Sequence, residues 1–492
     1  MIDETETMSP SHPRQLRKAL RWQDGVAVAL VPTAAAFAGL GPSIVVLGAW
    51  AAALLWAVCV VWGVAQTRLY AEMASMFPEK SGGFSLYANE GWRKYSTLVG
   101  PIATFGYWIG WSVALAVFGL VIGDVIQAQW FPHETWSFYD GAVHVGLPHL
   151  IAAALIILVW VLNVFGIRVL RASAWTFGVI FLIPVAIFLF APFLTGKWHA
   201  SNLAWSLPHG TMGLKVALSW MFIMGWTTTG TEIVASFTPE YVDAAKGTRT
   251  ALKWAGGFTL LFYVLMPLAI GGVATKAEMG VSSVGFFGPV FSRLLGGGGA
   301  IGIVLLCVSL ILVMNSSTAD GGRALYGSAV DGLTVKQLGV LNRHRMPARG
   351  MTVDLVINLA LVFFVGSPIA VLLAGNIGYF ISMIAAVTGF ILLRKDRPKW
   401  PRPIGAGRVW VYLAGLFAAF MVAATITAAL NPSITGYGNA TDFIIGIGII
   451  LVSLVLYVFR HVVQDRHRIQ LRDQDVPTMP APAEDSMVST PS

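Results

Sequence analysis

The chain has 492 residues, of which 56% are hydrophobic and only 11% are charged. Soluble globular proteins carry about 25% charged residues, so this composition excludes a soluble fold and indicates an all-α protein that crosses a membrane many times. The net charge of +8 comes from short basic clusters between apolar runs, as in cytoplasmic loops, and therefore does not indicate binding to nucleic acid.

The first apolar run is too long for a single membrane span. It follows a polar stretch, 1–21, that we predict to be disordered and cytoplasmic. The run covers 25–65, and as one helix it would be roughly 60 Å long, twice the thickness of the hydrocarbon core. The strongest breaker inside it is Gly39-Leu40-Gly41-Pro42, which predicts span one at about 24–41 and span two at about 42–65.

The remaining apolar runs bring the predicted number of spans to twelve. They lie at about 97–127, 147–166, 170–194, 212–237, 252–273, 300–320, 352–366, 368–393, 409–430 and 441–460. An even number of spans puts both termini on the same side of the membrane. A cytoplasmic N-terminus leaves only Lys197, Lys215, Lys276 and Arg293 outside, of 32 Lys and Arg residues. By the positive-inside rule, we predict a multi-pass protein of the cytoplasmic membrane with both termini cytoplasmic.

The spans fall into two units of similar length. Spans one to five occupy 22–194 and spans six to ten occupy 195–393, and each unit starts with an interrupted helix. An odd number of spans per unit gives the two units opposite orientations, as in inverted-repeat transporters. Two peripheral spans then occupy 394–463, and the Pro-rich tail, 464–492, is predicted to be a disordered cytoplasmic segment.

Span six contains the most unusual stretch of the chain, Gly225-Trp226-Thr227-Thr228-Thr229-Gly230-Thr231-Glu232. Two glycines around a threonine triplet favour a break in the helix, which lipid tolerates only where the backbone lines a protein cavity. Interrupted helices offer free backbone groups and hydroxyls to a polar solute, so the stretch predicts a substrate site near mid-membrane. The alternative is a continuous helix that packs closely on a neighbour through its small residues.

Four motifs stand in register with the predicted spans. They are Tyr70-Ala-Glu72-Met-Ala-Ser-Met-Phe-Pro78 followed by Gly82-Gly83, then Asn163-Val-Phe-Gly166, then Thr229-Gly230-Thr231-Glu232 with Glu240, and finally Gly322-Arg323-Ala-Leu-Tyr326 with Asp331-Gly332-Leu333 and Pro347. With these motifs the chain resembles, from about 24 to 460, the amino acid–polyamine–organocation superfamily of permeases. The resemblance implies a LeuT-like fold with a five-plus-five inverted repeat. It also implies a secondary active transporter for an amino acid or related amine, working by alternating access without a cofactor.

The resemblance places the substrate between the interrupted spans one and six. In span one, Ala35-Ala36-Phe37 stands where the family has a Gly-small-Gly break, and Pro32-Thr33 or Gly39 are the other positions at which the break is expected. In span six, Trp226 matches the aromatic residue that stacks on the substrate in the family's arginine–agmatine antiporters. The candidate substrate contacts are Thr33, Ala34, Ala35, Ala36, Tyr107, Trp111, Trp226, Thr227, Thr228, Thr229, Gly230 and Tyr379. Aromatic faces suit ammonium groups, although the chain's 18 Trp also serve packing and the membrane interface.

Glu232 is the acid expected inside the bundle, either in coupling and gating or in holding the helix break open. Some proton-coupled relatives carry a lysine in span five at the position of Phe181, which cannot hold a proton. Sodium-coupled relatives use a Ser/Thr pair in span eight, so Ser316 and Ser317 are possible Na⁺ ligands here. Three modes therefore stay open: Na⁺ at these two residues, H⁺ through Glu232, and uncoupled exchange.

Other functions are weaker alternatives. The alternatives are an obligate antiporter of two such solutes and a permease for an amine without an α-carboxylate; a non-transporting receptor and a membrane enzyme are remote. The nine histidines lie in tails, connections or span ends, and no catalytic or metal-binding spacing is present. The expected partners are a small amino acid or amine, Na⁺ or H⁺, and the lipid bilayer. Glu72 and Arg323, at span ends, are expected to form structural ion pairs.

Overall fold

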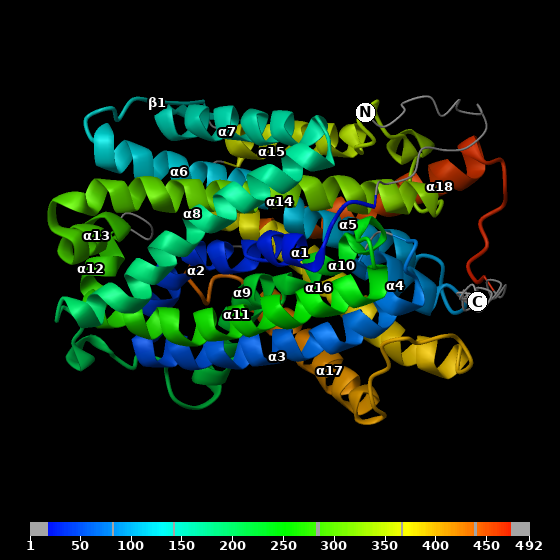
Figure 1. Ribbon diagram of the computed structural model, residues 1–492, viewed down its shortest axis with the longest axis horizontal. Helices are drawn as coiled ribbons and strands as arrows, with labels where there is room; N and C mark the ends of the chain where they lie inside the picture. Colours follow the sequence, from blue (N-terminus) through cyan, green and yellow to red (C-terminus); the bar gives the residue numbers. More distant parts are fainter. Residues whose placement is uncertain are drawn as a thin grey trace, which may run out of the picture.

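The computed structural model describes residues 18–473, apart from 81–82, 141–142, 282–285, 366–367 and 437–439. Long helices run side by side along the longest axis of the molecule (Figure 1). Gly82 of the first motif, and the predicted disordered stretches 1–17 and 474–492, lie outside the described residues.

The first half of the chain contains eight α-helices and one hairpin among its described residues. The helices are α1 (Trp22–Val28), α2 (Val31–Leu47), α3 (Ala49–Met76), α4 (Gly83–Trp92), α5 (Val99–Ser112), α6 (Ala114–Trp130), α7 (Leu147–Val164) and α8 (Ile167–Leu194). The strands β1 (Ser137–Tyr139) and β2 (His144–Gly146) pair antiparallel in the connection between α6 and α7, with Phe138 opposite Val145. This hairpin was not expected in an all-α protein.

The second half continues with helices that include short 3₁₀ segments. These are α9 (Gly210–Thr228), η2 (Gly230–Glu232), α10 (Ile233–Ser236), η3 (Thr238–Glu240), α11 (Ala244–Val273), α12 (Lys276–Val281), α13 (Phe287–Leu295), α14 (Gly299–Val330), η5 (Lys336–Gly339), α15 (Ala348–Phe364), α16 (Pro368–Asp396), α17 (Val409–Leu430) and α18 (Ala440–Phe459). Short segments η1 (Ala200–Asn202) and η4 (Gly296–Gly298) and a π-helical turn η6 (Arg460–Gln464) complete the described elements.

Ten of the described helices are long and apolar enough to cross a membrane. The chain is therefore an all-α, multi-pass membrane protein, apart from its small hairpin. Two of the twelve predicted spans are not among the ten, namely those that contain α9 and α15. The first is interrupted after Thr228 and carries several hydroxyl residues, and α15 has only 17 residues.

The predicted boundary between spans one and two is wrong. Helix α2 runs through Gly39 and Pro42 to Leu47, and the chain turns at Gly48. Gly48 has φ 77° and ψ 155°, a conformation open essentially to glycine alone, and a Cβ there would lie 2.4 Å from the carbonyl oxygen of Ala204. A proline inside a membrane helix removes only one helical hydrogen bond, which neighbouring groups restore, so Pro42 did not end the helix.

The break inside span one also lies away from the expected positions. Helix α1 ends at Val28 and α2 begins at Val31, so the interruption is at Ala29 and Leu30. Pro32 occupies the first turn of α2, where a proline suits a helix start because the missing N–H has no helical acceptor in any case. The proline therefore marks where the helix resumes, one turn before the predicted Ala35-Ala36-Phe37.

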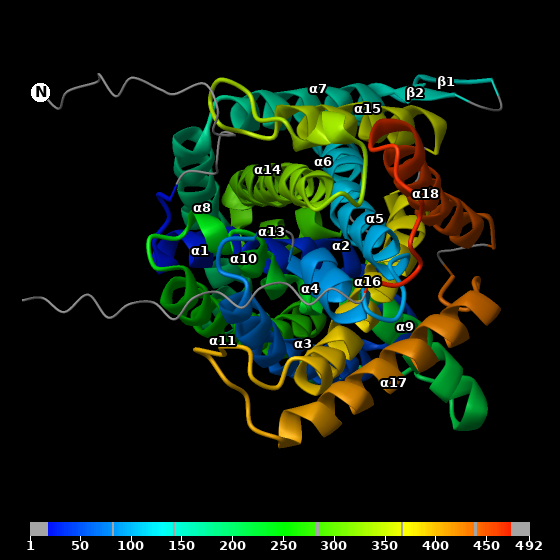
Figure 2. The same cartoon turned by 90° about the vertical axis from the view of Figure 1, so that its right-hand side faces the viewer.

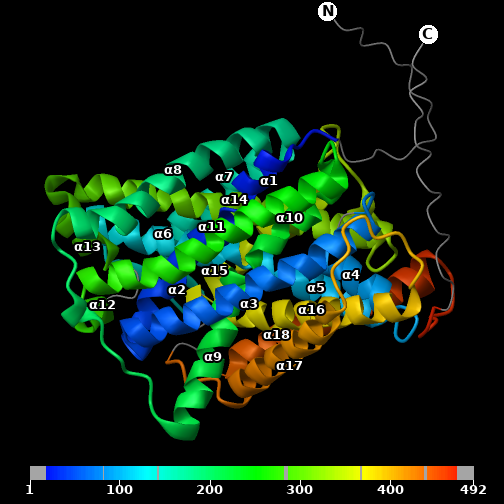
Figure 3. The ribbon, with the colours of Figure 1, turned by 60° about the horizontal axis from the view of Figure 1, so that its bottom comes forward.

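Helix α14 lies inside the bundle, and the last two helices lie outside it. In the view along the bundle, α7 and α15 form one outer side and α17 lies on the opposite side (Figure 2). Helix α17 covers the outside of α9 and α16 (Figure 3). The most apolar part of Val99–Trp130 is 89% buried, against 33% for Val409–Leu430 and 28% for Phe443–Gln464. The last two helices are thus peripheral in the described structure.

Both described ends of the chain are held against the bundle, in contrast to the predicted disorder of 18–21 and 464–473. The amides of Ala19 and Leu20 donate to the carbonyl of Glu240, both at 2.9 Å. At the other end, residues 464–473, the C-terminal strap, reach the connection between α4 and α5. Composition alone did not reveal these contacts, because each depends on a partner far away in the sequence.

The C-terminal strap joins two separate connections. Near its start, Asp465 pairs with Lys336 at 2.7 Å. Near its end, Asp473 forms an ion pair with Arg93, and the amide of Thr97 donates to the carbonyl of Leu471 at 3.0 Å. The pKa of Asp465 is lowered to about 2 by its hydrogen bonds with Lys336 and Arg460.

Substitution of Gly48 tests the corrected boundary. We expect Gly48→Ala to lower the apparent melting temperature of the purified protein, because the strained backbone alone costs about 1–3 kcal/mol and the new Cβ clashes with Ala204. The matched control is Gly415→Ala in α17, where a Cβ meets nothing within 4 Å. Equal melting temperatures for the two variants would contradict the turn at Gly48.

Candidate functional site

The interruption of span six takes the form of a tightened helix. Helix α9 ends at Thr228, the 3₁₀ turn η2 follows, and α10 resumes at Ile233. The hydroxyls of Thr228 and Thr229 donate to the carbonyls of Met224 (3.1 Å) and Gly225 (2.5 Å). The carbonyl of Gly225 also accepts the amide of Thr229 at 3.2 Å, so the threonine hydroxyls reinforce the end of α9.

The glycine–threonine stretch also packs closely on a neighbouring helix, as the alternative interpretation predicts. A Cβ at Gly63 of α3 would lie 2.3 Å from the carbonyl oxygen of Thr228. Helix α3 therefore passes directly against the backbone at the end of α9. The glycine–threonine stretch both interrupts span six and brings a neighbouring helix into contact.

Helices α5 and α16 both donate to the carboxyl group of Glu232, which is fully buried. The hydroxyl of Tyr379 in α16 donates to Oε1 at 2.6 Å, and the indole Nε1 of Trp111 in α5 donates to the same oxygen at 3.1 Å. Thr229 lies 3.4 Å from the Tyr379 hydroxyl. The other carboxyl oxygen, Oε2, has no hydrogen-bond partner in the described part of the chain.

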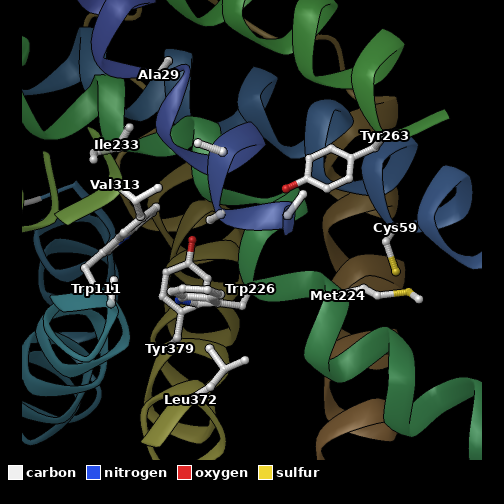
Figure 4. Close-up of a cluster of buried hydrophobic side chains, with 14 of the residues drawn as sticks. Ala29, Cys59, Trp111, Met224, Trp226, Ile233, Tyr263, Val313, Leu372 and Tyr379 are labelled. Atoms are coloured by element: carbon white, nitrogen blue, oxygen red, sulfur yellow. The ribbon is translucent and has the colours of Figure 1, made fainter. Parts of the chain in front are cut away.

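The predicted aromatic residues form one cluster around this carboxyl group. The rings of Trp111 and Trp226 are 6.1 Å apart, and Tyr379 lies edge-on to Trp111 at 6.1 Å. Tyr107 stacks on Tyr379 at 6.3 Å. Figure 4 shows the rings of Trp111, Trp226 and Tyr379 gathered below the blue ribbon of α2. Trp226 is held there by a 2.7 Å hydrogen bond from Nε1 to the carbonyl of Gly110.

Other predicted site residues lie apart from this cluster or bond within their own helix. Thr33, Ala34, Ala35 and Ala36 lie in the regular part of α2, where the amide of Ala34 donates to Leu30 and the hydroxyl of Thr33 does likewise. The amides of Ala34, Ala35 and Ala36 are thus bonded within the helix, whereas the amide of Thr33, in the first turn of α2, is one of the free groups beside the break. Thr227 and Thr228 direct their hydroxyls to Met224, and Gly230 begins η2 beside Glu232.

Ser316 and Ser317 lie on α14 and are fully buried. Within the described residues, neither hydroxyl has a hydrogen-bond partner. Phe181, at the position of the lysine in some relatives, packs among other rings, 6.3 Å from Phe37 and 6.1 Å from Phe262. No group of three or more His, Cys, Asp and Glu side chains suited to a metal ion occurs among the described residues.

Two buried acids were missed by the sequence analysis. Asp320 on α14 accepts a hydrogen bond from Ser236, which stands one helical turn after Glu232. Asp354 on α15 accepts from Nε1 of Trp108 at 2.6 Å. Both are fully buried. The available signal was a carboxylate within or next to a predicted apolar span, which is costly in a membrane and hence a functional candidate.

Glu240 and Glu72 are held in buried ion pairs. Arg323 on α14 forms a buried, two-pronged pair with Glu240, and its guanidinium lies 4.6 Å from the ring centre of Phe237. Glu72 pairs with Arg394 and, at 3.1 Å, with Arg402. The structure thus places both Glu72 and Arg323 in ion pairs with partners distant in the sequence.

A comparison with known protein families identifies the family of this protein. A family model described as amino acid permease matches residues 26–455. The chain belongs to the amino acid permease family. It is therefore a member of the amino acid–polyamine–organocation superfamily and of a family of transporters, not of enzymes.

Several curated relatives resemble this permease at low identity. The amino-acid permease RocE of Bacillus subtilis is 27% identical over 58% of this chain and 60% of the relative. The lysine-specific permease LysP of Escherichia coli is 24% identical, over 58% of each. The polyamine transporter PUT1 of Oryza sativa is 23% identical over 81% of this chain and 70% of the relative. The matches to the first two relatives thus cover about three fifths of their length.

A double-mutant cycle tests the bond between Tyr379 and Glu232 in this permease. We expect Tyr379→Phe to lower the free energy of unfolding by about 1–3 kcal/mol, because a buried carboxyl oxygen loses a donor. In a Glu232→Gln background the same change is expected to cost less, and Tyr412→Phe, at a site 80% exposed, serves as control. Additive effects in thermal unfolding would contradict the bond.

Proposed function

We propose that this permease is a secondary active transporter that moves an amino acid or a related amine across the cytoplasmic membrane by alternating access. The observation that carries the proposal is the carboxyl group of Glu232, which is buried at an interrupted helix, lies among Trp111, Trp226 and Tyr379, and has one unpartnered oxygen. Such a site suits an ammonium group. Relatives named as amino acid and polyamine permeases support the same substrate classes.

We further propose twelve spans in a five-plus-five inverted repeat, with units at 22–194 and 195–393. The pattern of neighbouring helices supports this. If the unit α1–α8 is matched to α9–α16, the contact of α5 with α16 corresponds to that of α14 with α8, and the contact of α6 with α7 corresponds to that of α14 with α15. The contacts between α3 and α11 and between α7 and α15 map onto themselves. A two-fold relation between the units requires this pattern.

The distribution of charge supports cytoplasmic termini. The connection between α16 and α17 carries Arg397, Lys399, Arg402 and Arg408, whereas the hairpin connection, 131–145, carries no Lys or Arg. The positive-inside rule puts the first on the cytoplasmic side and the second outside. A topology reporter that reads external when inserted at 394–408 would contradict this orientation.

Binding and uptake measurements test the proposed activity. We expect at least one amino acid or amine to raise the melting temperature of the purified protein, because a ligand of the folded state stabilises it, and to be taken up by proteoliposomes. Gly230→Leu is expected to abolish uptake, since it adds a bulky side chain in the turn that holds Glu232. Gly415→Leu in α17 is the control. Uptake at the wild-type rate in Gly230→Leu would show that the site lies elsewhere.

Of the three coupling modes, we propose sodium as the one to test first. The hydroxyls of Ser316 and Ser317 are buried without partners among the described residues, and oxygen ligands suit a hard cation. Helix α14 also contacts α2, whose start borders the break at Ala29 and Leu30. A carbonyl at that break would complete an oxygen site in the proposed arrangement.

Uptake with and without sodium tests this mode. We expect an inward Na⁺ gradient to accelerate uptake, choline replacement to slow it, and Ser316→Ala with Ser317→Ala to abolish the difference. Ser309→Ala is a matched control on the same helix, because its buried hydroxyl already donates to Leu305 at 2.6 Å. If choline leaves the rate unchanged and a proton gradient alone drives accumulation, sodium is excluded and Glu232 becomes the residue to change.

A further inference from the structure

Three basic residues lie on one outer face of α11, near the start of the helix. Lys246, Arg249 and Lys253 are all exposed, and their spacing of three and four residues places them side by side along the helix. The helix rises by roughly 10 Å from Lys246 to Lys253. Within the described residues, none of these three side chains forms an ion pair or a hydrogen bond. We call the three residues the basic face.

The acids that flank the start of α11 are engaged elsewhere. The carboxylate of Asp243 caps the helix by accepting the amide of Lys246 at 3.0 Å, and both carboxylate oxygens of Glu240 bind Arg323. Like charges three and four residues apart on a helix repel each other, and a cation in the first turn opposes the helix dipole. An anion from outside the chain would relieve this repulsion.

A pair of stacked tryptophans adjoins the basic face. Trp254 follows Lys253 and is 59% exposed, and its ring stacks on that of Trp22 in α1, with the ring centres 6.4 Å apart. Both tryptophans lie where an apolar run starts, because the sequence predicts one span from about 24 and another from about 252. Exposed tryptophan at such a position is typical of the headgroup region of a bilayer. The basic face and the tryptophans therefore lie at the level of the lipid headgroups.

An exposed apolar stripe continues from the tryptophans along α11. Leu261 and Leu265 follow Trp254 at helical spacing on the same side of the helix, and both are exposed. Gly257 lies between Trp254 and Leu261, and a Cβ there would meet nothing within 4 Å, so the surface is open at this point. A soluble anion does not require such a stripe. A phospholipid, by contrast, has a charged headgroup for the basic face and acyl chains for the apolar stripe.

We propose that the basic face, together with Trp22 and Trp254, forms a binding site for an anionic phospholipid, whose phosphate group lies against the three cations. The lipid contacts α1 as well as α11, because one tryptophan comes from each helix. The site lies at the end of the bundle where the described chain begins, since the amide of Val242 donates to the carbonyl of Leu20 at 2.9 Å. It is exposed, unlike the buried site around Glu232, and does not depend on which solute is transported.

Paired lipids test the site with the full-length protein purified in a neutral detergent. Phosphatidylglycerol and phosphatidylcholine with the same acyl chains differ in net charge, the first being anionic and the second zwitterionic. We expect phosphatidylglycerol to bind at least about tenfold more tightly in a native mass spectrometry titration, because each basic residue at the membrane surface attracts anionic lipid. The triple variant Lys246→Gln, Arg249→Gln and Lys253→Gln is expected to bring the affinity ratio to about one, with little change for phosphatidylcholine.

The matched control changes three exposed cations of other connections, Arg345, Lys399 and Arg408, to Gln. It lowers the net charge by the same amount, and we expect it to keep the wild-type affinity ratio. If the triple variant fails to fold, the single variant Arg249→Gln decides, with an expected loss of about fivefold in the ratio.

Three results would overturn the lipid site. The first is equal affinity of the wild-type protein for the two lipids. The second is a loss of the ratio in the control variant as large as that in the triple variant, because the preference would then follow net charge and not the basic face. The third is binding of inorganic phosphate as tight as that of phosphatidylglycerol, which would indicate a site for soluble anions.

Discussion

A lipid bilayer supplies no water to backbone groups, and the region around Glu232 is built to meet that constraint where span six stops being a regular α-helix. Threonine hydroxyls bind the carbonyls of the last turn of α9, and η2 shortens the hydrogen-bonding pattern without abandoning it. The buried carboxyl group then draws donors from α5 and α16. Helices α5 and α16 are thus linked to the interrupted segment through one carboxyl oxygen.

Close helix contacts make this possible. A Cβ at Gly106 of α5 would lie 2.3 Å from the carbonyl oxygen of Gly378 in α16, and one at Gly110 would lie 2.6 Å from the Cβ of Tyr379. Because both helices have glycine at the crossing, their backbones approach closely enough for Tyr379 and Trp111 to reach the same carboxyl oxygen. Larger residues at Gly106 or Gly110 would separate the two donors from their acceptor.

Sequence patterns predicted the apolar helices, the interruption near Thr229 and the aromatic residues that surround Glu232, because these depend on local composition and on family motifs. They misplaced the end of span one, because Gly39 and Pro42 resemble a turn in the sequence. The turn is at Gly48, where the backbone approaches Ala204 closely, and this contact cannot be recognised from the local sequence. Asp320 was detectable as a carboxylate inside a predicted apolar span, but its contact with Ser236, 84 positions away, was not. Contacts between distant segments carry no local signal, and the same holds for the C-terminal strap.

The C-terminal strap closes the chain into a non-covalent loop. One of its ends is fixed to Lys336, in the connection between α14 and α15, and the other to Arg93 and Thr97, beside α4 and α5. Sliding of these two regions past each other must either carry the strap along or break its ion pairs and backbone hydrogen bonds. Within the described residues, the ion pairs and hydrogen bonds that fix the strap lie at these two connections, so a change at Asp465 or Asp473 alters the link between them without altering the bonds to Glu232.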